Sequence, residues 1–151
     1  MDNSQFPAQM DGEKMPSLNH SFICTQILRQ LFQNDTFQPL TELTLDIDKG
    51  MTPDICVYPK EKIRPNFLRD ITRFQEMPIL AVEVLSTSQT IQELLEKASM
   101  LVSAGVKVVW TIEPYGQTIF VTTKEGETFQ HNPKVESEGI RVNFTEVFGV
   151  S

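Results

Sequence analysis

Cysteine is scarce in this sequence, with only Cys24 and Cys56 among 151 residues, on separate apolar segments. Neither cysteine has a second cysteine or an adjacent histidine, so the spacing argues against a metal knuckle or a redox pair. Both are expected to be small buried hydrophobic residues. The chain must therefore fold without disulfides, and its length suffices to bury a core in one domain of ordinary size.

Long hydrophobic runs are also missing. The most apolar segments, MPILAVEVL and KVVWTI, are interrupted by charge or fall well short of a membrane span. No segment near the N-terminus joins a basic stretch to an apolar core, as a secretion signal would. With 40% hydrophobic and 22% charged residues, the composition is that of a soluble globular protein. We expect a cytoplasmic protein without membrane association.

Basic residues are outnumbered by acidic ones, 13 to 20, and the formal net charge is −7. Proteins that bind nucleic acids usually carry a basic face, because neutralising phosphates supplies much of their affinity. One mostly basic stretch occurs, and it contains Lys60, Glu61, Lys62, Arg64, Arg69 and Arg73. A solvated loop is the favoured interpretation of this stretch, and a DNA contact is the alternative.

The first part of the chain divides into an arm and two or three elements. Residues 1–17 contain prolines and a glycine without periodicity, which predicts a flexible arm before a single domain over residues 18–151. Helical spacing of apolar residues predicts a helix from a cap at Asn19 or Ser21 to about Asn34. Alternation over 40–48 predicts a half-buried strand, and residues 53–58 follow a Lys49-Gly50 turn as its hairpin partner.

The second part of the chain predicts an α/β fold. A nearly continuous apolar strand over 79–85 precedes a helix that begins at Ser88 or Thr90 and stops at Gly105. Another buried strand over 106–112 completes a βαβ unit. Residues 117–123, 127–131 and 140–147 give short strand or hairpin signals, with one helical turn as an alternative for the last.

Three charged residues stand out against this apolar pattern. Glu83 lies inside the buried strand 79–85, where a carboxylate needs a compensating charge, and Asp54 begins an apolar strand. Two carboxylates on neighbouring strands suit a hard divalent cation such as Mg²⁺. Lys97, in the following helix, is placed to reach the same point. The alternatives are a turn role for Asp54, a structural Glu83–Lys97 ion pair, and a solvated Lys97 paired with Glu93.

The order of these motifs resembles a known pattern. PDICV, AVEVLSTSQT, a helix with Glu93 and Lys97, and GVKVVWTIEP follow one another at sensible distances. Over roughly residues 19–148 the sequence resembles the PD-(D/E)xK nuclease superfamily, and within it the small bacterial Uma-type restriction endonucleases. His20 and the closing RVNFTEVFG also match. The chain departs from the pattern at Leu85, where the superfamily has its lysine, and at Val108-Val109, which replace the acidic-aromatic pair of the family's EYW while Trp110 keeps its tryptophan.

The resemblance implies a restriction-endonuclease-like core, with a mixed central β-sheet flanked by helices. It implies an endonuclease that hydrolyses DNA phosphodiester bonds with Mg²⁺ or Mn²⁺, held by Asp54, Glu83 and the carbonyl of Val84. Lys97 would take the role of the lysine missing at position 85, orienting the attacking water or stabilising charge. His20 and Glu93 are implied as accessory residues. DNA is the expected partner, and a homodimer is compatible with the sequence.

Two other functions remain open at this point. The acidic net charge and the changed residues after Gly105 favour a catalytically weakened nuclease fold that serves as an interaction or binding module. A small-ligand α/β binding protein has only generic fold support.

Overall fold

The computed structural model describes residue 15 and residues 17–149. The arm predicted over residues 1–17 falls outside the described residues, apart from Met15 and Ser17. Within the described part of the chain, no helix combines the length and apolar character needed to cross a membrane.

A six-stranded sheet forms the centre of the domain, in the order β1-β2-β3-β4-β5-β6. The central β3 and β4 are parallel and every other neighbouring pair is antiparallel, so the sheet is mixed, as predicted. A separate two-stranded sheet pairs β7 with β8. The strands are β1 Phe37–Thr41, β2 Ile55–Pro59, β3 Leu80–Val84, β4 Val108–Glu113, β5 Thr118–Thr123, β6 Gly126–Gln130, β7 Lys134–Ser137 and β8 Ile140–Asn143.

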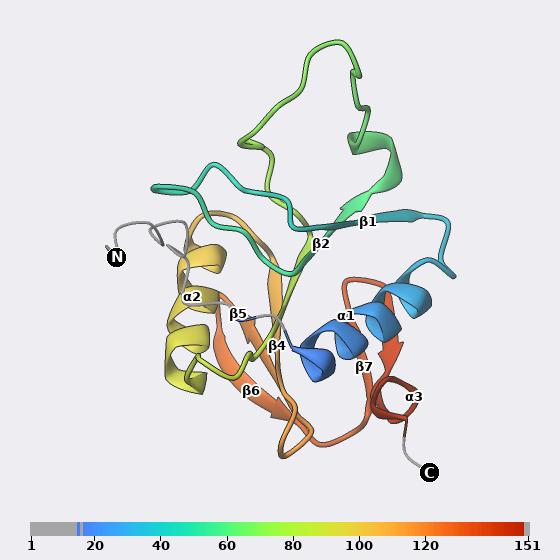
Figure 1. Ribbon diagram of the computed structural model, residues 1–151, viewed down its shortest axis with the longest axis vertical. Coiled ribbons are helices and arrows are strands. Elements are labelled where there is room, and N and C mark those ends of the chain that lie inside the picture. The colour runs from blue at the N-terminus through green and yellow to red at the C-terminus, as the bar shows by residue number, and fades with distance from the viewer. Residues whose placement is uncertain (1–14, 16, 150–151) are drawn as a thin grey trace.

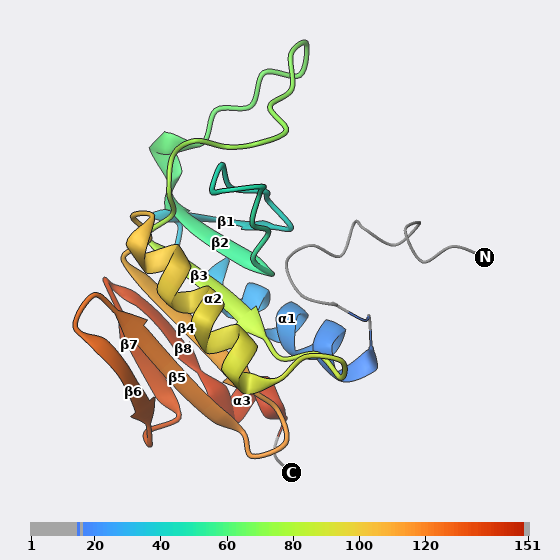
Figure 2. The same ribbon diagram turned by 90° about the vertical axis from the view of Figure 1, so that its left-hand side faces the viewer.

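Helices cover both faces of the central sheet (Figures 1 and 2). Helix α2 (Ile91–Ser103) connects β3 to β4 and packs on one face, against β4 and β5. Helices α1 (Leu18–Leu31) and α3 (Phe144–Phe148) lie on the other face together with β7 and β8. The sheet therefore separates two hydrophobic clusters, one centred on Trp110 and one on Leu101 beneath α2.

The helices begin close to where the sequence predicts. Ser17 caps α1 by accepting a hydrogen bond from the backbone N–H of His20, so the helix starts before both predicted caps, Asn19 and Ser21. Thr90 caps α2, as predicted, and Gly105 follows the helix with φ +117°, a conformation that favours glycine.

The strand predicted over 40–48 is wrong in position. Strand β1 ends at Thr41, because Glu42 adopts a left-handed φ of 54°. Residues 42–54 then form an irregular loop, closed by a bridge between Leu45 and Met51. The alternation arose because Leu45 is buried in this loop, not because the chain is extended. The predicted pairing is nevertheless confirmed, since β1 and β2 are antiparallel neighbours.

A long connection joins β2 to β3 and projects from the domain, at the top of Figure 2. It begins with a short 3₁₀ helix, η2 (Lys60–Lys62). The basic stretch lies on this connection and its charged side chains are exposed, whereas Ile63 and Phe74 are half-buried. At its base the Tyr58 hydroxyl donates to the carbonyl of Glu76 at 2.8 Å, and the ring meets Phe74 edge-on. Burial raises the pKa of Tyr58 well above its ordinary value, so the hydroxyl stays a donor.

Candidate active site

The register of β2 and β3 brings two carboxylates together. Ile55, the first residue of β2, pairs with Val82 of β3, and Asp54 and Glu83 are the next residues at this same end of the two strands. Both side chains are almost fully buried, with 2% and 1% of their surface exposed. Asp54 Oδ2 accepts a hydrogen bond of 2.7 Å from the backbone N–H of Val84.

Lys97 reaches this point from α2. Its neighbour Ala98 and the nearby Leu94 are buried against the sheet, which turns this side of the helix inward. The ammonium lies 2.5 Å from Glu83 Oε2, and only 7% of the lysine side chain is exposed. A buried carboxylate is tolerated when a cation offsets its charge, so Lys97 supplies the compensation that Glu83 requires. The structure therefore pairs Lys97 with Glu83, next to the backbone N–H of Val84 that binds the Asp54 carboxylate.

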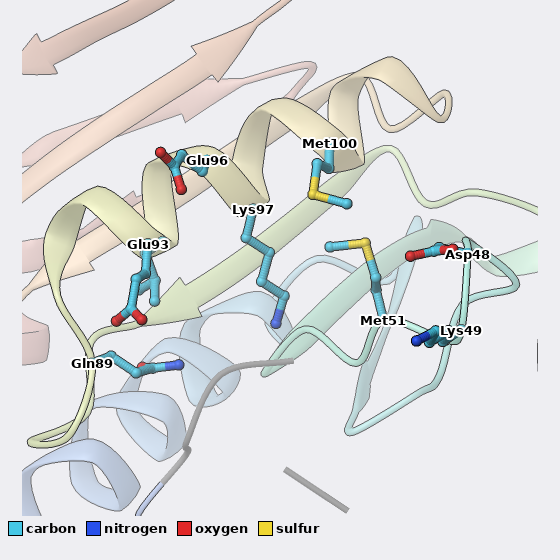
Figure 3. A pocket seen from close by; sticks show the side chains of 10 residues that line it. Asp48, Lys49, Met51, Gln89, Glu93, Glu96, Lys97 and Met100 are labelled. Carbon is cyan, nitrogen blue, oxygen red and sulfur yellow. The ribbon is translucent and has the colours of Figure 1, made fainter. Parts of the chain in front are cut away.

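A pocket of about 290 Å³ leads to Lys97 from outside. It lies between α2 and the turn over residues 48–51, and Glu93, Gln89 and Met100 line it on the helix side. Figure 3 shows the lysine extending away from α2, between the side chains of Gln89 and Met51. The pocket therefore provides an approach to the Lys97 side of the ion pair, whose charged groups are otherwise shielded from water.

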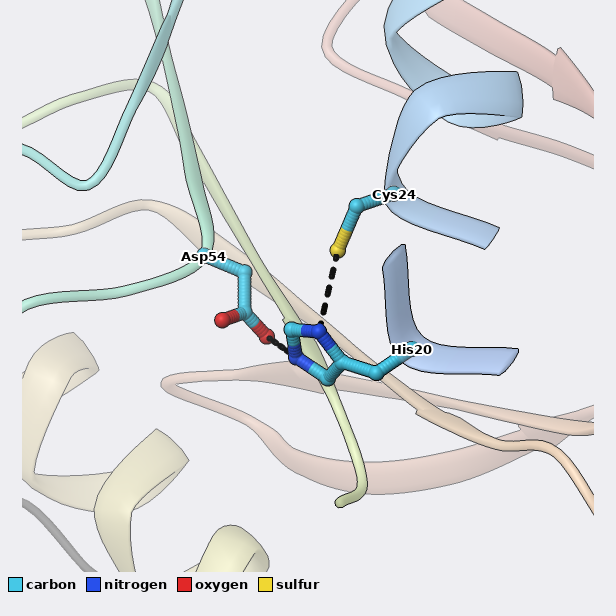
Figure 4. A group of neighbouring side chains, drawn as sticks. All are labelled: His20, Cys24 and Asp54. Atoms are coloured by element: carbon cyan, nitrogen blue, oxygen red, sulfur yellow. Dashed lines mark hydrogen bonds and ion pairs between the residues drawn. The ribbon is translucent and has the colours of Figure 1, made fainter. Parts of the chain in front are cut away.

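His20 joins the group from the first turn of α1. Its Nε2 lies 3.1 Å from Asp54 Oδ2, so that carboxylate oxygen is contacted from both the imidazole and the Val84 backbone. On the other side of the ring, Cys24 Sγ lies 4.0 Å from His20 Nδ1 (Figure 4). The structure thus brings the predicted accessory histidine directly to Asp54.

Cys24 is a residue that the sequence interpretation missed. It was expected to be an inert buried residue without a histidine beside it, yet it is half-buried and contacts His20 one helical turn away. The available signal was the i, i+4 spacing on a predicted helix. One ligand atom each from His20, Cys24 and Asp54 lie within 4.8 Å of one another, a group that could hold a metal ion. Thiolate, imidazole and carboxylate are ligands that Zn²⁺ accepts.

Glu93 has a structural task in this arrangement. Its carboxylate accepts a 2.8 Å hydrogen bond from the N–H of Thr90, and the Thr90 hydroxyl accepts one of 3.1 Å from the N–H of Glu93. This reciprocal capping box fixes the first turn of α2, one turn before Lys97. Glu93 lines the pocket, but the contacts that the structure gives it are those of a cap.

The parallel neighbour of Glu83 was also missed. Thr111 in β4 is paired in register with Glu83, so both side chains point to the same face. Thr111 is fully buried, and its hydroxyl has no hydrogen-bond partner among the residues that the structure describes. Where the family pattern has EYW, this chain has three residues that are buried in the core. The last of them, Trp110, lies on the sheet face opposite Thr111, where its indole N–H donates a hydrogen bond of 2.9 Å to the Ser137 hydroxyl.

The fold and the buried acidic pair together define a nuclease-like α/β protein, and comparison with known proteins identifies its family. The model of the Uma2 family, described as "Putative restriction endonuclease", matches residues 10–150, so the chain belongs to this family. The resemblance predicted from the motifs is confirmed. No curated protein matches the sequence.

A solved structure shares the fold. The crystal structure of a putative nuclease belonging to DUF820, from Anabaena variabilis ATCC 29413, superposes with a TM-score of 0.74. The two sequences are 19% identical, and the match covers 90% of this chain and 83% of the other. At this identity the likeness establishes the fold, which agrees with the predicted mixed sheet flanked by helices.

Proposed function

We propose that the protein is a metal-dependent endonuclease that hydrolyses DNA phosphodiester bonds, with Asp54, Glu83 and Lys97 as its catalytic residues. The observation that carries this proposal is the buried ion pair of Glu83 and Lys97, beside a pocket and next to the Val84 N–H that binds the buried Asp54 carboxylate. Membership of a restriction endonuclease family gives the reaction class. DNA as the substrate and the metal dependence are part of the proposal and go beyond family membership.

The residues at the site fit a hard divalent cation. Asp54 and Glu83 place two buried carboxyl groups near one another, the first in contact with His20 and the second with Lys97. Two carboxylates and a backbone carbonyl are oxygen donors of the kind that Mg²⁺ and Mn²⁺ prefer. We assign Asp54, Glu83 and the carbonyl of Val84 to this role. When bound, the cation supplies Lewis acidity and an activated water.

The protein groups around the site orient the Asp54 carboxylate and offset negative charge on the phosphate. The N–H of Val84 and the imidazole of His20 both contact Asp54 Oδ2, which fixes the direction of that carboxylate. Lys97 holds a positive charge where negative charge develops on the phosphate, and its buried stem limits its freedom to move away. α2 covers this face of the sheet, so the electrostatic interactions act with little solvent screening.

A plasmid-nicking assay tests the proposal. Supercoiled DNA should be cut with Mg²⁺ or Mn²⁺ and left intact in EDTA. Asp54→Asn, Glu83→Gln and Lys97→Met should each lower the rate by on the order of a hundredfold, the loss expected when one stabilising group is removed. Lys107→Met is the matched control, because that lysine is exposed and pairs with Glu138 away from the site. The proposal fails if neither cation binds at millimolar concentration in calorimetry and the wild type cuts no DNA.

A second function is favoured by the acidic charge of the chain and by the apolar residues Val108 and Val109. In this alternative the nuclease fold has lost catalytic power and acts as an interaction or binding module. Wild-type protein that binds DNA in a gel-shift assay, yet cuts none with either cation, would support the module and oppose the enzyme.

A further inference from the structure

The connection between β2 and β3 exposes an apolar tip. Phe67 and Leu68 are each 94% exposed and Ile71 is 60% exposed. Single exposed apolar residues are ordinary on protein surfaces, but here three occur within five residues. The connection that carries them projects from the domain (Figures 1 and 2). A pocket of about 340 Å³ beside the tip is lined by Phe67, Ile71 and Phe74 among others, which adds a concave apolar surface.

The same loop concentrates positive charge. Residues 60–73 contain five of the 13 basic residues of the chain but only two of its 20 acidic ones. Two of the five are used within the fold, since Lys62 pairs with Glu76 and Arg73 with Asp46. Arg64 and Arg69 flank the apolar tip, and neither makes an ion pair with any residue that the structure describes. A basic, apolar projection thus extends from an otherwise acidic protein.

The loop is held in a defined shape. At the tip, the Asn66 side chain accepts a hydrogen bond of 3.0 Å from the N–H of Leu68, and its carbonyl accepts one of 3.1 Å from the N–H of Arg69. At the base, Phe74 exchanges backbone hydrogen bonds with the 42–54 loop, and the Arg73 guanidinium donates to the carbonyl of Asp48. Because the loop is fixed at its base and by a turn at its tip, its binding to a partner costs little conformational entropy.

We propose that residues 64–69 form a second DNA-contacting element, in which Arg64 and Arg69 bind phosphates while Phe67 and Leu68 enter a groove and wedge against a base step. This inference rests on the proposed DNA substrate. Apolar wedges beside arginines are the means by which many proteins grip and unstack a duplex. Phosphates complement Arg64 and Arg69, and the chain outside residues 60–73 has 18 acidic residues against eight basic ones. DNA therefore suits the tip better than a second copy of the chain.

The position of the loop sets how far the proposed DNA contact lies from the carboxylates of Asp54 and Glu83. Strand β2 begins beside Asp54 and ends at Pro59, where the loop starts, five residues further on. At a rise of about 3.3 Å per residue this separation is roughly 17 Å, or about five base-pair steps of duplex DNA. The loop that carries the wedge therefore starts at that distance from the carboxylates, and the wedge contributes affinity without taking part in the chemistry.

Binding to a duplex that carries 2-aminopurine, measured in EDTA, tests the proposal separately from cleavage. The full-length wild type should bind and raise the fluorescence of the probe, because unstacking relieves its quenching. Phe67→Ala/Leu68→Ala should weaken binding by about tenfold or more and remove the fluorescence rise, given the usual value of a stacked or wedged side chain. Phe129→Ala is the matched control, an exposed aromatic on the far edge strand β6. It should leave both readouts unchanged.

Three results would overturn the inference. One is a wild type that does not bind the duplex at low salt. Another is a double variant with wild-type affinity and fluorescence. The third is a wild type that is dimeric in sedimentation velocity, together with a double variant that is monomeric and binds DNA as the wild type does. That result would make the tip a contact between two copies of the chain. A wild type that binds through the tip but never cuts DNA would support this inference and count against the proposed enzyme activity alone.

Discussion

Glu83 and Lys97 form an ion pair that is buried on both sides, and neither charge has much access to water. In such a pair the attraction is largely offset by the cost of removing two ions from solvent. Removing only one partner is different, because it leaves a buried charge without compensation. The contribution of the pair to stability and its contribution to catalysis can therefore be separated by substitution.

Lys97→Met should lower the free energy of unfolding by about 3 kcal/mol, the scale of an uncompensated buried charge. Glu83→Gln/Lys97→Met removes both charges and should recover most of that loss. Urea unfolding followed by circular dichroism measures both values. The double variant should remain inactive in the nicking assay despite its recovered stability. Equal stability of Lys97→Met and the wild type would contradict the pairing.

Cys24 and His20 offer nitrogen and sulfur donors beside Asp54, a carboxylate assigned to the Mg²⁺ or Mn²⁺ site. Zn²⁺ bound there would compete with the proposed cofactor for Asp54, because the carboxylate is shared. We expect micromolar Zn²⁺ to inhibit Mn²⁺-supported cleavage and Cys24→Ser to relieve the inhibition by about tenfold, since a thiolate ligand is lost.

Cobalt titration provides a readout of this group that does not depend on activity. Co²⁺ should give a thiolate charge-transfer absorption in the near ultraviolet with the wild type, and Cys24→Ser should abolish it. Cys56→Ala is the control, because Cys56 is buried beneath α2 and is not part of the His20 group. Absorption that persists in Cys24→Ser would exclude Cys24 as a ligand.

Individual site residues differ in how far the sequence could reveal them. Glu83 could be found because a carboxylate inside an apolar strand contradicts the local pattern. Its partner could be proposed because α2 follows the strand directly. Cys24 and Thr111 could not be found in the same way, since each is an ordinary residue in its own segment. The relevance of Thr111 depends on its register with Glu83 in another strand. The i, i+4 spacing within α1 could place Cys24 beside His20, but not the approach of Asp54 from a different element.

The start of α2 depends on the capping box between Thr90 and Glu93. Thr90→Ala should cost about 1 kcal/mol of unfolding free energy, the usual value of a lost N-cap. Glu93→Gln should be nearly neutral in stability, because glutamine also completes a capping box. Chemical denaturation measures both effects, and Mn²⁺ titration by calorimetry should give wild-type affinity for Glu93→Gln. A clear loss of Mn²⁺ affinity in that variant would instead make Glu93 a metal ligand.

Whole elements were predictable where pattern and boundary signals agreed. The segment before β4 has an apolar stripe, a capping threonine and a terminating glycine, and α2 forms where these signals place it. The irregular 42–54 loop was misread because a buried Leu45 imitates strand alternation. Strand β7 was not predicted, because among its four residues only Val135 is buried and no periodicity can be recognised. Short elements held by tertiary pairing leave little trace in sequence.

The distribution of charge over the molecule changes what its negative net charge implies about nucleic-acid binding. A net charge of −7 counts against nucleic-acid binding when the protein is treated as a uniform body. The structure places a large share of the basic residues on one projecting loop, and much of the acidic majority elsewhere. Over distances shorter than the Debye length of about 8 Å, a phosphate senses the nearby loop more than the remote body.

DNA affinity should therefore depend on salt through a small number of contacts. Each phosphate contact to duplex DNA contributes about −0.9 to the slope of log K against log salt concentration. Arg64→Gln/Arg69→Gln should reduce the magnitude of that slope by about 1.8, measured by fluorescence anisotropy in EDTA over a range of potassium chloride concentrations. Lys107→Gln/Lys124→Gln removes the same number of charges from the region where β4 begins and β5 ends, and its slope should equal that of the wild type. If both double variants changed the slope equally, DNA would be responding to net charge and the loop would have no special part in binding.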